Sequence, residues 1–135
     1  MKLPLTLACG DYDRTRALRW GLVETEGIDL NYLCMPVEET FWRTARFREF
    51  DVAEMSMGSY LIRRAKGIDD LVAIPVFPSF MFRHSAIFVR DDAGIREPRD
   101  LVGKRVGVPK YHMTAAVWVR GILEDEYGVS PTIDR

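Results

Sequence analysis

The chain contains little cysteine and little histidine, with two residues of each among 135. Two cysteines without a histidine-rich neighbourhood do not form a zinc site, and a structural disulfide is rare in a cytosolic protein. Because Cys9 and Cys34 both fall in predicted strands, we expect two buried free thiols. His84, His112 and Asp11 are the remaining candidate metal ligands, but the two histidines have no helical spacing, so we expect no metal site.

Long apolar runs are also absent. No run approaches the roughly 18 residues that a membrane-spanning helix needs, so we expect no membrane segment. Residues 1–5 lead directly into a strand-like segment, without the apolar stretch and small-residue cleavage site of a secretory signal. These absences together predict a cytoplasmic protein.

Neither sign of charge is in excess, because 19 Lys and Arg residues oppose 20 Asp and Glu residues and leave a net charge of −1. This balance argues against a nucleic-acid-binding protein, which usually carries a basic excess. Gly103-Lys104-Arg105 lacks the rest of a phosphate-binding loop, and no Cys/His/Asn arrangement supports Cys9 as a nucleophile. We expect no bound cofactor.

Apolar segments and helix signals alternate along the chain. We expect strands over residues 5–9, 28–35, 51–56, 71–77, 84–89 and 105–108. We expect helices over residues 14–24, 58–67 and 114–127. We expect a further helix after Pro36, with Val37, Phe41 and Ala45 as its buried stripe. This alternation predicts an α/β fold with a doubly wound, mainly parallel sheet.

A charged, glycine-containing break at residues 91–94 follows the first set of strands and helices, and we interpret it as a crossover between lobes. The predicted boundaries are 1–90 for a first α/β lobe, 91–103 for the crossover and 104–135 for the start of a second lobe. One strand and one helix cannot bury their own apolar faces, so we expect the second lobe to promote self-association. The apolar residues concerned are Val106, Val108, Val117, Trp118 and Ile122.

Segments 5–18 and 104–118 share one pattern: an apolar strand, a short polar loop and a helix start. A helix N-terminus presents unpaired N–H groups and a positive dipole end, which suit a carboxylate or a phosphate. Two such segments far apart in the sequence suggest two lobes that face one small anionic molecule.

Several motifs have a familiar form. The segment DLVGKRVGVP (100–109), followed by TAA (114–116), resembles the entry to the second lobe of type II periplasmic-binding-protein folds. The segments LACGDYDRT (7–15), PVEETF (36–41), DVAEMS (51–56), IPVFP (74–78) and MFRHS (81–85) are similar to the 4,5-dihydroxyphthalate decarboxylase family, which uses that fold. The resemblance extends from Leu3 to about Val129 and implies the N-terminal portion of an enzyme more than twice as long. It implies cofactor-independent decarboxylation of a hydroxylated aromatic dicarboxylate to the monoacid and CO₂.

Decarboxylation of an electron-rich aromatic acid needs donors that hold carboxylates, a proton donor near the ipso carbon and groups that orient phenols. Arg83 and His84 suit the first two tasks, because a guanidinium grips a carboxylate bidentately and an imidazole carries a proton near neutral pH. Alternatively, Arg83 pairs with a local acid and His84 is a satisfied strand-end residue. Asp11 is the third candidate catalytic residue, with a turn or cap as its alternative role.

The predicted substrate-binding residues lie on loops that flank strands or at helix starts. They are Tyr12, Ser56, Ser59, Tyr111, His112 and Thr114. Open α/β sheets bind ligands beyond the carboxyl ends of their strands, so we expect Asp11, Tyr12, Ser56, Arg83 and Thr114 to share one cleft. His112 is a second candidate proton donor, and capping is the alternative role for Ser59 and Thr114.

Two other functions fit the same sequence. The first is a non-catalytic binding protein for a small carboxylate that serves a transporter, since one fold supports both roles. The lack of an export signal favours the enzyme over this alternative. The second is an inactive truncated fragment, because the second lobe is expected to be barely begun.

Overall fold

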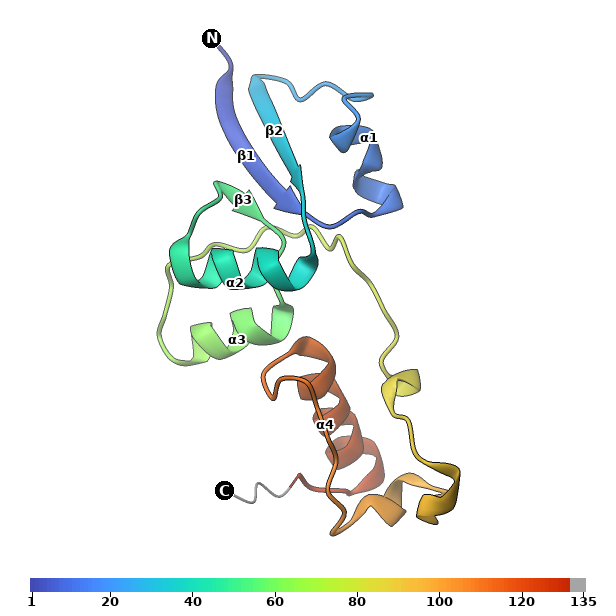
Figure 1. The fold of residues 1–135 in the computed structure, drawn as a ribbon. Helices are drawn as coiled ribbons and strands as arrows, with labels where there is room; N and C mark the ends of the chain where they lie inside the picture. Colours follow the sequence, from blue (N-terminus) through green and yellow to red (C-terminus); the bar gives the residue numbers. More distant parts are fainter. Residues whose placement is uncertain (132–135) are drawn as a thin grey trace. The chain divides into compact units, whose positions relative to one another are not determined.

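The computed structural model describes residues 1–131 and divides the chain into two compact units. Unit 1 consists of Met1–Ser56 and Leu71–Phe80, and unit 2 consists of Met57–Asp70 and the chain from Met81 onward. Figure 1 shows the course of the chain through both units. The division interleaves the two units along the sequence, and the boundaries expected at residues 90 and 104 stay predictions.

Unit 1 contains a parallel sheet of three strands among the described residues. They are β1 (Leu3–Cys9), β2 (Ile28–Cys34) and β3 (Val52–Ala53), in the order β2-β1-β3. Both neighbouring pairs are parallel, which confirms the predicted α/β class with a parallel sheet. All three strands therefore end at the same edge, where the loops after them meet.

The first predicted helix is much shorter than expected. A 3₁₀ turn, η1 (Asp13–Thr15), is followed by α1 (Arg16–Arg19). The expected extension to residue 24 is wrong because Gly21 has a φ of 66°, a left-handed conformation that ends a right-handed helix.

Helix α2 (Val37–Phe47) follows Pro36, as predicted. Its buried residues are Thr40 and Thr44, whose hydroxyls donate to the carbonyls of Pro36 (3.2 Å) and Thr40 (2.7 Å). The expected apolar stripe of Val37, Phe41 and Ala45 is only half-buried. The two threonines can be buried at this position because a helical carbonyl satisfies each hydroxyl.

Unit 2 is built from α3 (Met57–Ala65), α4 (Thr114–Tyr127) and the 3₁₀ turns η2 (His84–Ala86), η3 (Asp91–Ala93) and η4 (Pro98–Leu101). Its core is the cluster of Leu101, Leu123 and Val129. Helix α4 has the predicted bounds, and Gly128 ends it with a φ of 66°. None of the helices within residues 1–131 is long and apolar enough to cross a membrane.

Three predicted strands, over residues 71–77, 84–89 and 105–108, do not form. Pro75 and Pro78 cannot donate to a strand ladder, and Val76 instead donates its N–H to the Ile74 carbonyl (2.7 Å) in a tight turn. Residues 84–86 form η2, and residues 105–108 have no strand partner among the described residues. The second strand–loop–helix pattern therefore retains its helix, α4, but not its strand.

Candidate active site

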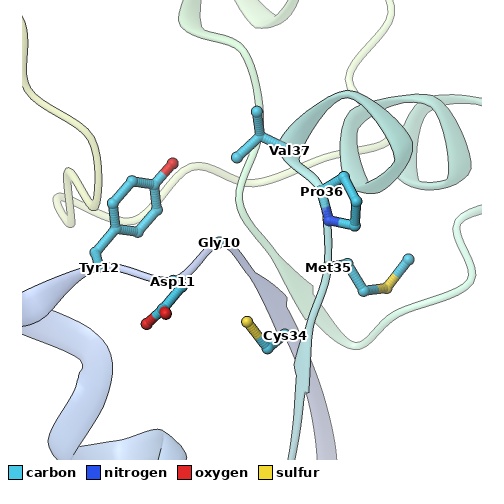
Figure 2. Close-up of a pocket in the computed structure, with 7 residues that line it drawn as sticks. All are labelled: Gly10, Asp11, Tyr12, Cys34, Met35, Pro36 and Val37. Carbon is cyan, nitrogen blue, oxygen red and sulfur yellow. The ribbon is translucent and has the colours of Figure 1, made fainter.

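A pocket of about 440 Å³ lies in unit 1 where β1 and β2 end. Its lining comes from the turn after β1 and from the junction of β2 with α2, as Figure 2 shows. The lining residues are Gly10, Asp11, Tyr12, Cys34, Met35, Pro36 and Val37. Asp11 and Tyr12, both predicted site residues, thus lie at the carboxyl edge of the sheet, where α/β proteins bind ligands.

The buried carboxylate of Glu54 holds the Tyr12 side chain in place. Glu54 follows β3 and is 8 % exposed. Its oxygens accept hydrogen bonds from the Tyr12 hydroxyl (2.7 Å), the Gly10 N–H (3.2 Å) and the Cys9 thiol (3.8 Å). Burial raises the pKa of Tyr12 and the adjacent Glu54 raises it further, while a hydrogen bond with Ser79 acts in the opposite direction. The Tyr12 phenol therefore stays protonated beside the pocket.

Asp11 is a half-exposed carboxylate tied to the helix that follows it. Its oxygens lie 3.6 Å from Arg16 Nε and 3.1 Å from Arg19 Nη1. These ion pairs orient Asp11 without burying it, so the carboxylate can accept a hydrogen bond from a ligand in the pocket.

Tyr32 of β2 braces the turn that carries Asp11 and Tyr12. Its hydroxyl lies 3.1 Å from the Gly10 carbonyl oxygen and 3.0 Å from Thr15 Oγ1. Burial is the main reason that the pKa of Tyr32 rises to about 12. No sequence pattern predicted this role for Tyr32.

In unit 2, the starts of α3 and α4 are in contact. The Gly58 N–H donates to Thr114 Oγ1 (3.1 Å). A Cβ atom at Gly58 would lie 3.0 Å from Thr114 Cα and 3.1 Å from the His112 carbonyl oxygen. Three predicted binding residues, Ser59, His112 and Thr114, therefore lie close together, because Ser59 follows Gly58 in α3. Thr114 bonds to the neighbouring helix, and the N-cap of its own helix is Met113.

Tyr111, next to this contact, is covered by Arg120 of α4. The Arg120 guanidinium lies 3.7 Å from the centroid of the Tyr111 ring, and its Nη1 donates to the Tyr111 carbonyl (2.9 Å). This cation–π contact fixes the loop before α4.

Arg83 and His84 lie before and within η2, and not at the start of a strand as expected. His84 Nε2 is 3.2 Å from each carboxylate oxygen of Glu126, and the Phe82 ring stacks on the imidazole at 4.5 Å. Arg83 Nη1 lies 3.3 Å from Met81 Sδ. His84 therefore has an acidic partner on α4, within unit 2.

Ser56 is buried at the end of the loop after β3. The expected cleft joins residues of unit 1 with Arg83 and Thr114 of unit 2, and it stays a prediction.

Cys9 is a buried free thiol, but Cys34 is exposed because β2 is an edge strand and its last residue faces the pocket. Within residues 1–131, no group of three His, Cys, Asp or Glu side chains has metal-binding geometry.

A comparison with protein families matches residues 17–132 to the family described as NMT1/THI5 like. The chain belongs to this family. The parallel α/β sheet agrees with the periplasmic-binding-protein-like fold that the sequence motifs predicted.

Two relatives of this NMT1/THI5-like chain are named 4,5-dihydroxyphthalate decarboxylase. The protein of Comamonas testosteroni is 49 % identical over 128 residues, which cover 95 % of this chain and 39 % of the relative. The protein of Pseudomonas putida is 44 % identical over 128 residues, which cover 95 % of this chain and 50 % of the relative. The predicted resemblance is confirmed, and the chain spans half or less of the length of these relatives.

Glu54, like Tyr32, is a site residue of this NMT1/THI5-like chain that no sequence pattern singled out. The expected strand over residues 51–56 placed Glu54 inside a strand, whereas β3 ends at Ala53. The available signal was a single acidic residue among apolar neighbours directly after Val52 and Ala53. A buried acid needs hydrogen-bond partners, which the Gly10 N–H and the Tyr12 hydroxyl supply to Glu54.

Proposed function

We propose that the protein carrying this chain removes one carboxylate, as CO₂, from 4,5-dihydroxyphthalate or a closely similar hydroxylated aromatic dicarboxylate. The observation that carries the proposal is the 44–49 % identity over 95 % of the chain to two proteins of that name. The pocket at the end of β1 gives further support, because it lies at the carboxyl edge of the sheet, where α/β proteins bind small molecules.

The proposed reaction exchanges a carboxylate for a proton. A hydroxyl para to the carboxylate makes the ipso carbon electron-rich, so this carbon takes up a proton first. The ring–carboxylate bond then breaks, CO₂ leaves, and the electron pair of that bond restores the aromatic ring, so the chemistry needs no cofactor. The product from 4,5-dihydroxyphthalate is 3,4-dihydroxybenzoate.

We assign the candidate residues to separate tasks. Asp11 and Tyr12 line the pocket, where they can accept hydrogen bonds from ligand hydroxyls and pack against a ring. Arg83 is proposed to hold a carboxylate, and His84, supported by Glu126, to deliver the proton. His112 is the second candidate for the proton donor.

The function is tested by CO₂ release from 4,5-dihydroxyphthalate. Two proteins are compared: the 135-residue chain, and the same chain joined to the segment of the Comamonas testosteroni relative that it does not span. We expect turnover from the joined protein only. A site that excludes water and orients the acid must enclose the substrate, and the open pocket of unit 1 does not. The relative itself is the positive control. A folded joined protein that binds the diacid without CO₂ release would favour the carboxylate-binding alternative.

Substitutions in the active protein separate binding from chemistry. Arg83→Ala is expected to raise KM by roughly tenfold or more, because a carboxylate loses a charged partner worth about 1.5–3 kcal/mol. His84→Ala is expected to lower kcat by ~10²-fold or more and to leave KM nearly unchanged. An unchanged kcat in the His84 variant would contradict this role for His84 and would make His112 or Asp11 the candidate proton donor.

The partner implied by this function is a small aromatic carboxylate. We also propose that the 135-residue chain associates with itself, as the sequence analysis expected. Of the residues named there, Val106, Val108 and Trp118 are exposed, whereas Val117 and Ile122 are half-buried.

A further inference from the structure

We propose that Cys9 and Cys34 form a reactive dithiol, which a small-molecule disulfide converts reversibly to a Cys9–Cys34 disulfide in the wall of the pocket. The proposal does not depend on the decarboxylase function. It rests on the register of β1 and β2, on the unequal exposure of the two thiols and on the acid beside the buried one.

The strand register places the two cysteines side by side. Cys9 and Cys34 are direct partners in the parallel pair of β1 and β2, each as the last residue of its strand. Partners in register point to the same face of a sheet, and neighbouring strands are about 4.8 Å apart. That spacing lies within the roughly 4.4–6.8 Å between Cα atoms that a disulfide requires. Both thiols also raise the pKa of Tyr32, which lies on the same face.

The two thiols differ in access. Cys34 is exposed and lines the pocket, and Figure 2 shows its side chain directed from β2 toward the turn after β1. Cys9 is only 2 % exposed. An oxidant that enters the pocket therefore meets Cys34 first, and Cys9 can react only with a group already attached to Cys34.

The buried thiol has a proton acceptor. Cys9 Sγ lies 3.8 Å from Glu54 Oε2. Burial, together with the Glu54 carboxylate, raises the pKa of Cys9, so free Cys9 is mainly protonated and a poor nucleophile. Transfer of its proton to Glu54 would generate the thiolate at the moment of attack.

The reaction balances as two thiol–disulfide exchanges. The Cys34 thiolate attacks one sulfur of the disulfide RSSR, and one RS⁻ leaves to give a mixed disulfide on Cys34. Cys9 then attacks Cys34 Sγ, its proton passes to Glu54, and the second RS⁻ leaves. Two RSH molecules and one protein disulfide result once the departing thiolates are protonated. Because Cys34 Sγ can be reached from the pocket, a small thiol can attack it and reduce the disulfide again, which makes the site responsive to the thiol pool.

The experiment treats the folded 135-residue chain with oxidised glutathione and maps the products by non-reducing peptide mass spectrometry. We expect a Cys9–Cys34 linked peptide, loss of both free thiols in the same molecules, and full recovery after dithiothreitol. A wild-type chain that accumulates only the glutathione adduct of Cys34, or only dimers linked between chains, would overturn the proposal.

Matched variants test the order of events. Cys9→Ser should stop at a stable glutathione adduct on Cys34, and Cys34→Ser should stay unmodified because Cys9 is buried. Glu54→Gln should leave adduct formation unchanged and slow ring closure by about tenfold or more, as expected for loss of a general base. Equal rates of Cys9 modification in the wild type and in Cys34→Ser would contradict the assigned order. Far-UV circular dichroism confirms that each variant is folded, and the wild-type result stands without them.

Discussion

Glu54 is the residue on which the geometry of the pocket depends most. It is a buried acid with three hydrogen-bond donors, supplied by Cys9, Gly10 and Tyr12. Two of these donors belong to the pocket lining, so one carboxylate links the end of β3 to the turn after β1. A buried carboxylate is tolerated only when its oxygens are hydrogen-bonded, and this one joins neighbouring strands through them.

Replacement of Glu54 tests this role. Glu54→Ala leaves the Gly10 N–H and the Tyr12 hydroxyl without an acceptor, which we expect to lower the free energy of unfolding by about 1–3 kcal/mol. Urea denaturation measures the change, and Glu24→Ala, at an exposed position, is the control with little expected effect. Glu54→Gln keeps the shape but removes the charge, so the pKa of Tyr12 should fall. Absorbance titration against Tyr12→Phe detects that shift, and an unchanged titration would contradict the assigned cause.

Sequence reasoning located some residues of the pocket and missed others for a physical reason. Asp11 and Tyr12 were identifiable because a polar pair follows an apolar strand, β1, after a single glycine. Glu54 and Tyr32 were not, since their importance arises from hydrogen bonds to the turn at Gly10, which lies more than twenty residues away in the sequence. Local composition carries no information about such partners.

At the scale of elements, the helix signals were more reliable than the strand signals. Helix α4 was predicted with its observed bounds because its last residue is followed by Gly128, which takes the left-handed conformation of a helix stop. The apolar runs at 71–77 and 105–108 looked equally clear but form no strand. A strand exists only with a hydrogen-bonded neighbour, and an apolar run does not reveal whether that neighbour is present.

The contact between α3 and α4 depends on a missing side chain. A Cβ atom at Gly58 would lie 3.0 Å from Thr114 Cα, which is closer than most Cβ contacts in proteins. Because the neighbouring atom belongs to the backbone, α3 or α4 would have to shift to make room for it. Gly58→Ala should therefore destabilise this contact by about 1–3 kcal/mol. Gly121→Ala is the matched control: its Cβ meets nothing within 4 Å, and it should stabilise α4 by roughly 0.5–1 kcal/mol. Hydrogen exchange of the α4 amides reports both changes, and equal exchange in the two variants would contradict the close contact.

At the scale of the whole molecule, the residues assigned to the proposed reaction are distributed over both units. The pocket with Asp11 and Tyr12 belongs to unit 1, and Arg83, His84 and Glu126 belong to unit 2. The family match at 17–132 includes most of unit 1 and all of the described unit 2 residues. Every residue assigned to the reaction except Asp11 and Tyr12 therefore lies within the family match.

Large apolar side chains exposed on both units predict that the 135-residue chain associates with itself. Val72 and Phe80 of unit 1 are 90 % and 87 % exposed, and Phe88 of unit 2 is 90 % exposed. Burial of such side chains against a second chain is favourable, because removing apolar surface from water yields about 25 cal/mol per Å². Sedimentation velocity over a range of concentrations should therefore show an average mass that rises with concentration.

The double variant Phe80→Ser/Phe88→Ser should shift that rise to higher concentrations, whereas Trp118→Ser tests the contribution of α4. A wild-type chain that sediments as a monomer throughout would contradict the prediction and would mean that these side chains are covered within the folded chain in solution.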